Sequence, residues 1–84
     1  MDANQTAYLT GEVQALLAEA LHLPAEQVPP DLAFGDLPQW DSMGHMEVML
    51  LLEQRFGVEI SAETITALTS APVICTYLQE NGHA

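Results

Sequence analysis

Apolar residues recur at helical spacing along the chain, and this pattern predicts two long helices. In the first, from about Thr6 to Leu21, apolar residues lie three or four positions apart, as in an amphipathic helix that Pro24 ends. The second, from about Ser42 to Phe56, is followed by Gly57, a residue that favours helix ends. The pattern therefore favours a helical protein.

Two shorter helical segments follow. Residues 62–68 come after Ser61, a favoured N-cap, and the segment "SAPVICTYLQENG" has Pro72 in its first turn and Gly82 beyond its end. No alternating segment is long enough to predict a strand. We expect an all-α fold, a small four-helix bundle of three main helices and one short helix with a long first loop. It should form one domain over residues 1–84, with an ordered core from about residue 5 to 80.

The segment between the two long helices, residues 22–41, has no steady period. It holds four of the five prolines together with Gly35, so we interpret it as a long loop with one short helical turn. Loops of this length are uncommon in compact domains and are usually functional. We expect four apolar side chains to pin it to the core, namely Val28, Leu32, Phe34 and Leu37.

The helix predicted over residues 42–56 has two unlike faces. One stripe is expected to point inward, and it consists of His45, Val48, Met49, Leu52 and Phe56. The opposite stripe mixes apolar and acidic residues, and it consists of Met43, Met46, Glu47, Leu50, Glu53 and Gln54. Such a mixture is unusual for a face that meets only water, although a partly solvated helix side gives the same pattern.

Charge is the strongest bulk property of the chain. Twelve acidic residues face a single base, Arg55, and the formal net charge is −11. This balance argues against nucleic acid and anionic lipid as partners and favours proteins with basic patches. An acidic surface that only provides solubility would have the same composition. No apolar run approaches the ~20 residues of a membrane span, and the N-terminus is unlike a secretory signal, so we expect a cytoplasmic protein. We also expect a monomer.

The lone cysteine and the histidines indicate neither a disulfide nor a metal centre. Cys75 has no second cysteine to pair with and stands among apolar residues, which favours a small buried hydrophobe. His22, His45 and His83 lack the spacing of metal ligands. We therefore predict no metal site.

Ser42 follows Asp41 where the loop becomes a helix, and three interpretations are open. Either residue could cap the helix by accepting hydrogen bonds from its first N–H groups. A serine nucleophile has little support, because there is no G-x-S-x-G elbow and His45 is expected to pack inward. A phosphate ester on Ser42 is the third interpretation, since helix N-termini favour anions.

The run from Asp36 to Ile60 resembles the acyl carrier proteins, whose signature is an Asp-Ser-Leu-like triplet that opens a long helix. Here the triplet is Asp41-Ser42-Met43, followed by "GHMEVMLLLEQRFGVEI". The likeness extends over the chain, from a first helix and a proline-rich loop with "FGDL" to a short third and a closing fourth helix. It implies that a separate Mg²⁺-dependent transferase attaches 4′-phosphopantetheine from coenzyme A to Ser42. The thiol of this arm would then hold an acyl group as a thioester.

The same resemblance implies further roles. The chain would be a carrier and not an enzyme, and Asp41 would help to position the transferase and its metal, with no permanent metal site. Basic acyl-loading and acyl-processing enzymes would dock on the recognition helix, at Met43, Met46, Glu47, Leu50 and Glu53.

The residues before the triplet, Asp36-Leu37-Pro38-Gln39-Trp40, depart from the commonest fatty-acid pattern. The Trp-Asp-Ser form is similar to discrete carriers of specialised, polyketide-type pathways. An aminoacyl or peptidyl carrier remains an alternative, since Met43 also resembles D-alanyl carriers, and so does an unmodified acidic adaptor. Met1 and the set of helices lead us to expect a free-standing protein.

Overall fold

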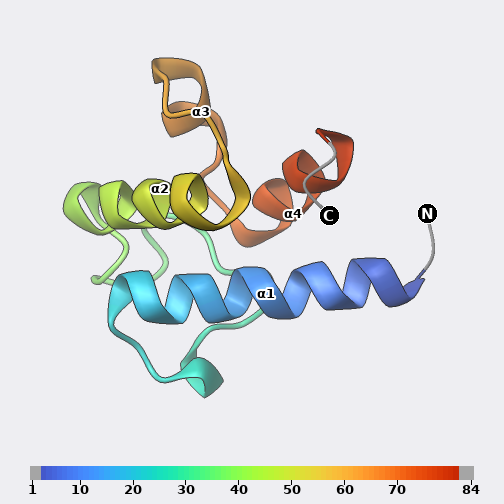
Figure 1. Ribbon diagram of the computed structural model, residues 1–84. Coiled ribbons are helices and arrows are strands. Elements are labelled where there is room, and N and C mark those ends of the chain that lie inside the picture. The colour runs from blue at the N-terminus through green and yellow to red at the C-terminus, as the bar shows by residue number, and fades with distance from the viewer. Residues whose placement is uncertain (1–2, 82–84) are drawn as a thin grey trace.

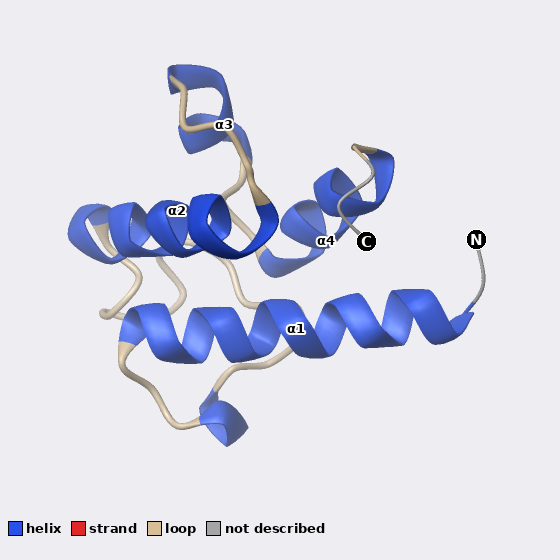
Figure 2. Ribbon diagram, viewed as in Figure 1, coloured by secondary structure: helices blue, strands red, loops and turns tan. Residues whose placement is uncertain are grey.

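The computed structural model describes residues 3–81, and its fold there is all-α, as predicted (Figures 1 and 2). Within these residues the α-helices are α1 (Ala3–Leu21), α2 (Ser42–Phe56), α3 (Ala62–Ala67) and α4 (Ala71–Glu80), with one 3₁₀ turn, η1 (Ala25–Gln27). The predicted bounds hold for α2, whereas α1 begins at Ala3 instead of Thr6 and α3 ends one residue early. Gly82 and His83 lie outside the described residues.

The core lies between α1, α2 and α4. α1 and α2 run side by side in opposite directions, α4 packs against α1, and α3 lies on the far side of α2 (Figure 1). The predicted inward stripe of α2 is buried except for Phe56, which is half-buried. The largest fully buried side chains come from three helices and the loops, and they include Leu9, Leu16, Leu17, Leu32, Trp40, Met49, Leu52, Ile74 and Leu78.

The long loop is fixed to the helices by backbone pairing and apolar contacts. Val28 and Leu32 are buried and Leu37 is half-buried, as predicted. The prediction for Phe34 is wrong, because this side chain is 43% exposed. Its N–H donates to the carbonyl of Thr69 at 2.8 Å, which holds the loop beside the α3–α4 connection and leaves the Phe34 ring at the surface.

α1 ends in a Schellman turn at His22, before the predicted stop at Pro24 is reached. His22 has a left-handed backbone (φ 59°), and its N–H donates to the carbonyl of Glu19 at 3.4 Å. The next N–H, that of Leu23, donates to the carbonyl of Ala18 at 2.9 Å. These bonds satisfy carbonyls that a helix end otherwise leaves unpaired.

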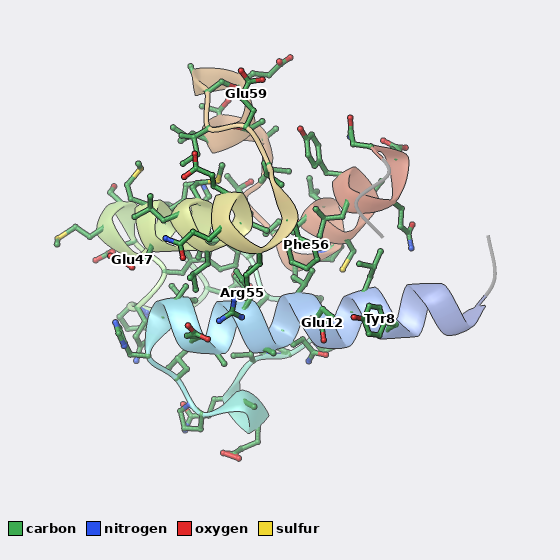
Figure 3. The ribbon with its side chains drawn as sticks, in the orientation of Figure 1. Tyr8, Glu12, Glu47, Arg55, Phe56 and Glu59 are labelled. Atoms are coloured by element: carbon green, nitrogen blue, oxygen red, sulfur yellow. The ribbon has the colours of Figure 1, made fainter. Side chains whose placement is uncertain are left out.

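The one basic side chain of the sequence, Arg55, pairs with Glu19 across α2 and α1. Figure 3 shows Arg55 reaching from α2 towards α1. The two side chains are 41% and 58% exposed, so the pair contributes little to stability. Its larger effect is on the surface field, because it neutralises the only cationic side chain and leaves the acidic residues elsewhere without a counter-charge.

Cys75 is half-buried at the contact between α4 and α1, where it packs against the core. Burial raises the pKa of its thiol, and a hydrogen bond with Thr10 opposes that shift in part. A thiol held mainly in its protonated form is a poor nucleophile, so Cys75 acts as a packing residue, as the sequence predicts.

No helix within the described residues is long and apolar enough to cross a bilayer.

Candidate functional site

The first turn of α2 is capped by Asp41, and this answers which of the two residues is the cap. Asp41 Oδ1 accepts a hydrogen bond from the Gly44 N–H at 2.9 Å, and the Asp41 carbonyl accepts one from the His45 N–H at 2.8 Å. Ser42 is the first residue inside the helix, and its side chain is exposed. Within the described residues the Ser42 hydroxyl has no hydrogen-bond partner. The hydroxyl is therefore free to react with an external group.

The other two serines of the chain are used differently. Ser61 Oγ accepts a hydrogen bond from the Thr64 N–H at 3.2 Å and caps α3. Ser70 Oγ accepts one from the Val73 N–H at 3.2 Å and caps α4. Both hydroxyls therefore accept a helix-capping hydrogen bond, which the Ser42 hydroxyl does not.

Gly44 allows the end of the loop to lie directly against α2. A Cβ atom at this position would be 2.2 Å from the backbone oxygen of Gln39 and 3.0 Å from a methyl group of Leu21. No side chain can occupy that space unless the backbone moves. The glycine therefore fixes where Asp41 and Ser42 lie relative to the end of α1, a role that the sequence alone did not reveal.

A buried hydrogen-bonded chain links the loop, α2 and α3 beneath this turn. Trp40 Nε1–H donates to His45 Nδ1 at 3.0 Å, and His45 Nε2 lies 2.7 Å from the carbonyl oxygen of Ile65. Because the indole N–H can only donate, Nδ1 is the acceptor and Nε2 carries the proton that is donated to Ile65. Trp40 is fully buried and His45 is 5% exposed. We refer to this arrangement as the Trp40–His45–Ile65 chain.

The Trp40–His45–Ile65 chain also supplies a hydrogen bond that is missing at the C-terminal end of α3. In a continuous helix the Ile65 carbonyl would accept from the N–H of Thr69, but that N–H donates to Ala67 instead. His45 supplies the missing donor from a neighbouring helix. With both of its nitrogens engaged, His45 has none left to act as a base for Ser42, which weakens the nucleophile interpretation further.

Two grooves lie beside the start of α2, and Ser42 itself lines the first of them. The α2–α3 groove has a volume of about 450 Å³ and is lined by Phe34, Ser42, His45, Met46, Ile65, Thr66 and Thr69. The α1–α2 groove has a volume of about 430 Å³ and is lined by Ala20, Leu21, His22, Gln39, Met43, Gly44 and Glu47. A group attached to Ser42 thus has an apolar surface beside its point of attachment.

The mixed stripe of α2 faces away from the core, as predicted. Met43 is 81% exposed, Met46 and Leu50 are about half as exposed, and Glu47 and Glu53 are also at the surface. Figure 3 shows Glu47 near the start of α2, pointing away from the bundle. The five residues predicted to dock partners therefore lie on one accessible helix. Among the described residues no His, Cys, Asp and Glu side chains cluster in a way that could hold a metal ion.

Comparison with known proteins gives concordant matches. The family model described as "Phosphopantetheine attachment site" matches residues 11–78. An acyl carrier protein of Helicobacter pylori (strain G27) is 33% identical over 70 residues, which cover 83% of this chain and 90% of the relative. One from Thermosynechococcus vestitus is 31% identical over 75 residues, or 89% and 91% of the two chains. No solved structure gave a significant match.

The chain belongs to the acyl carrier protein family. It is therefore a carrier and not a catalyst, and its prosthetic group is a covalently attached 4′-phosphopantetheine. The start of α2 fits this group, since it offers an exposed, unpartnered hydroxyl at the positive end of a helix dipole.

Proposed function

We propose that Ser42 is the attachment point of 4′-phosphopantetheine, and that the chain shuttles acyl thioesters between enzymes of a specialised, polyketide-type pathway. The observation that carries the attachment site is the contrast among the three serines. Two hydroxyls are hydrogen-bonded in helix caps, whereas the Ser42 hydroxyl is exposed and without a partner. The pathway type is supported by the Trp40-Asp41-Ser42 sequence.

In the attachment reaction, Ser42 Oγ would form a bond to the β-phosphorus of coenzyme A as the pyrophosphate P–O bond to that phosphorus breaks. Adenosine 3′,5′-bisphosphate would leave, and a base of the transferase would take the hydroxyl proton. The chain's own contribution is to present the hydroxyl in a fixed place. The Asp41 cap and the close approach at Gly44 hold the first turn of α2. The Asp41 carboxylate is exposed, and we assign it the additional role of facing the transferase and its Mg²⁺. When bound, the arm supplies the thiol that carries the acyl group.

The exposed stripe of α2 is the proposed docking face for partner enzymes. Met43, Met46 and Leu50 provide adaptable apolar contact, because methionine side chains adjust to irregular surfaces. Glu47 and Glu53 attract basic patches and accelerate encounter. A net charge of −11 also opposes self-association, which supports a monomer, and we place the carrier in the cytoplasm.

Intact-mass measurement tests the attachment site. The purified protein is incubated with coenzyme A, Mg²⁺ and a promiscuous phosphopantetheinyl transferase. We expect a mass gain of one phosphopantetheine that is lost in Ser42→Ala and retained in Ser61→Ala and Ser70→Ala. Modification of a folded Ser42→Ala protein would contradict the assignment. The other two variants control for any effect of removing a serine hydroxyl.

A further inference from the structure

The floor of the α2–α3 groove, directly beside Ser42, is a polar side chain fixed at both ends. His45 lines the groove and is itself only 5% exposed, and beneath it lies the fully buried ring of Trp40. The centroids of the two rings are 6.1 Å apart. On the outer side, the ring of Phe34 meets the imidazole edge-on, with centroids 5.6 Å apart. His45 therefore separates an accessible groove from the apolar core.

This side chain resists displacement because moving it would break two hydrogen bonds at once. Its Nδ1 accepts from Trp40 at 3.0 Å, and its Nε2 donates to the Ile65 carbonyl at 2.7 Å. An acyl chain that pushed the imidazole aside could replace neither bond, since a hydrocarbon neither donates nor accepts. The Trp40 N–H would then be left unpaired in the interior, and the part-buried Ile65 carbonyl would also lose its donor. The second bond also ties α3 to α2, so it opposes separation of the two helices that form the groove.

We propose that His45 is the depth stop of the α2–α3 groove and is thereby a residue that determines cargo specificity. It holds an acyl group extending from Ser42 in the outer groove, against Phe34, Met46 and Ile65, and keeps it out of the core. The carrier can then shelter only the part of an acyl group that fits the outer groove, and the rest stays accessible to partner enzymes. This inference rests on attachment at Ser42.

Quenching of Trp40 by a bromine atom tests the proposal, because Trp40 is the only tryptophan of the chain. A transferase attaches coenzyme A analogues whose arms end in amide-linked alkyl chains of increasing length, each carrying a terminal bromophenyl group. Matched arms carry a phenyl group without bromine. Bromine quenches tryptophan emission at contact and over the few ångströms beyond it, so the ratio of the two emissions reports whether the arm reaches the indole.

We expect the two arms to give equal emission in the wild-type protein at every chain length. His45→Ala removes the stop, and the bromine arm should then lower Trp40 emission at least twofold. His45→Gln should behave as the wild type does, since its amide can accept from Trp40 and donate to Ile65. Thr66→Ala should also match the wild type, because Thr66 lines the same groove but takes no part in the Trp40–His45–Ile65 chain.

Quenching in the wild-type protein would overturn the proposal, and so would unquenched emission in a loaded, folded His45→Ala protein. If His45→Ala does not fold, His45→Thr, which opens less space, takes its place with the same expectation. Failure of the attachment at Ser42 is visible separately, because intact mass would show no arm on the wild-type protein. That result would contradict the proposed function itself, and it would be known before any emission is compared.

Discussion

The first turns of α2, α3 and α4 contain similar residues, but the serine near the start of α2 has a different role from the serines that cap α3 and α4. α3 and α4 are each capped by a serine whose hydroxyl accepts a hydrogen bond from the N–H three residues further along. α2 is capped by Asp41, whose carboxylate accepts in the same way, and its serine lies one residue further along. A cap needs only one acceptor, so an acid in that place leaves the next hydroxyl unoccupied. The Asp-Ser order thus separates the structural role from the reactive one.

The largest expected effect is that of Ser42→Ala on loading. Attachment of phosphopantetheine should fall to zero, because no other hydroxyl occupies this position. Stability should change by less than about 0.5 kcal/mol, as for surface substitutions away from caps, since Asp41 and not Ser42 holds the helix end. Intact mass measures the first effect and urea unfolding measures the second. A loss of more than about 1 kcal/mol would show that Ser42 shares the cap after all.

Gly44→Ala should destabilise the protein by about 1–3 kcal/mol, because its methyl group would meet the backbone of Gln39. Loading should also slow, since the turn that carries Ser42 has to move. Gly11→Ala in α1 is the matched control, because a Cβ there has no atom within 4 Å. That variant should be more stable by about 0.5–1 kcal/mol, the usual gain for alanine within a helix. Equal effects in urea unfolding would exclude a special role for Gly44.

Removing each helix cap in turn should distinguish the cap of α2 from those of α3 and α4. Asp41→Ala, Ser61→Ala and Ser70→Ala should each cost about 0.5–2 kcal/mol, as measured by urea unfolding. Only Asp41→Ala should also slow loading, because only this residue stands beside the modified serine. If all three variants loaded at the wild-type rate, Asp41 would be a cap and nothing more.

The smallest expected effect concerns the charges on α2. Reversing Glu47 and Glu53 to lysine should slow association with a partner enzyme severalfold at low salt, and much less at high ionic strength, where charges are screened. Stopped-flow association with the transferase measures this. Reversing Glu26 in η1 and Glu63 in the first turn of α3 to lysine is the matched control, because it changes the net charge by the same amount, and it should have a weaker effect. Equal slowing by both would show that net charge, and not the α2 face, attracts the partner.

The sequence predicts those parts of the molecule that local chemistry determines. Gly57 ends α2 in a left-handed conformation, and Ser61 caps α3. The inward and outward stripes of α2 follow from the helical period alone. These features depend on residues a few positions apart, so the pattern along the chain is sufficient to find them.

The features that the sequence did not reveal depend on distant parts of the chain. Trp40 was treated as part of a motif, yet it is fully buried and bonded to His45. His45 was expected to face inward, but its second bond is to Ile65, 20 residues away, and no local spacing indicates it. Phe34 was expected to pin the loop to the core as one of four apolar side chains, while the pairing of its N–H with the Thr69 carbonyl keeps it outside. Which apolar side chain of a loop is buried is decided by tertiary contacts.

The pairing of Arg55 with Glu19 has a chemical consequence for a thioester carried on the arm. Thioesters acylate free amines irreversibly, and a lysine within reach of the arm would turn cargo into a permanent amide on the carrier itself. The sequence has no lysine, and its one arginine is a guanidinium that stays protonated and is held by a carboxylate. No side-chain amine of the chain can therefore compete with the acceptor that a partner enzyme presents, and a loaded acyl group is preserved for transfer.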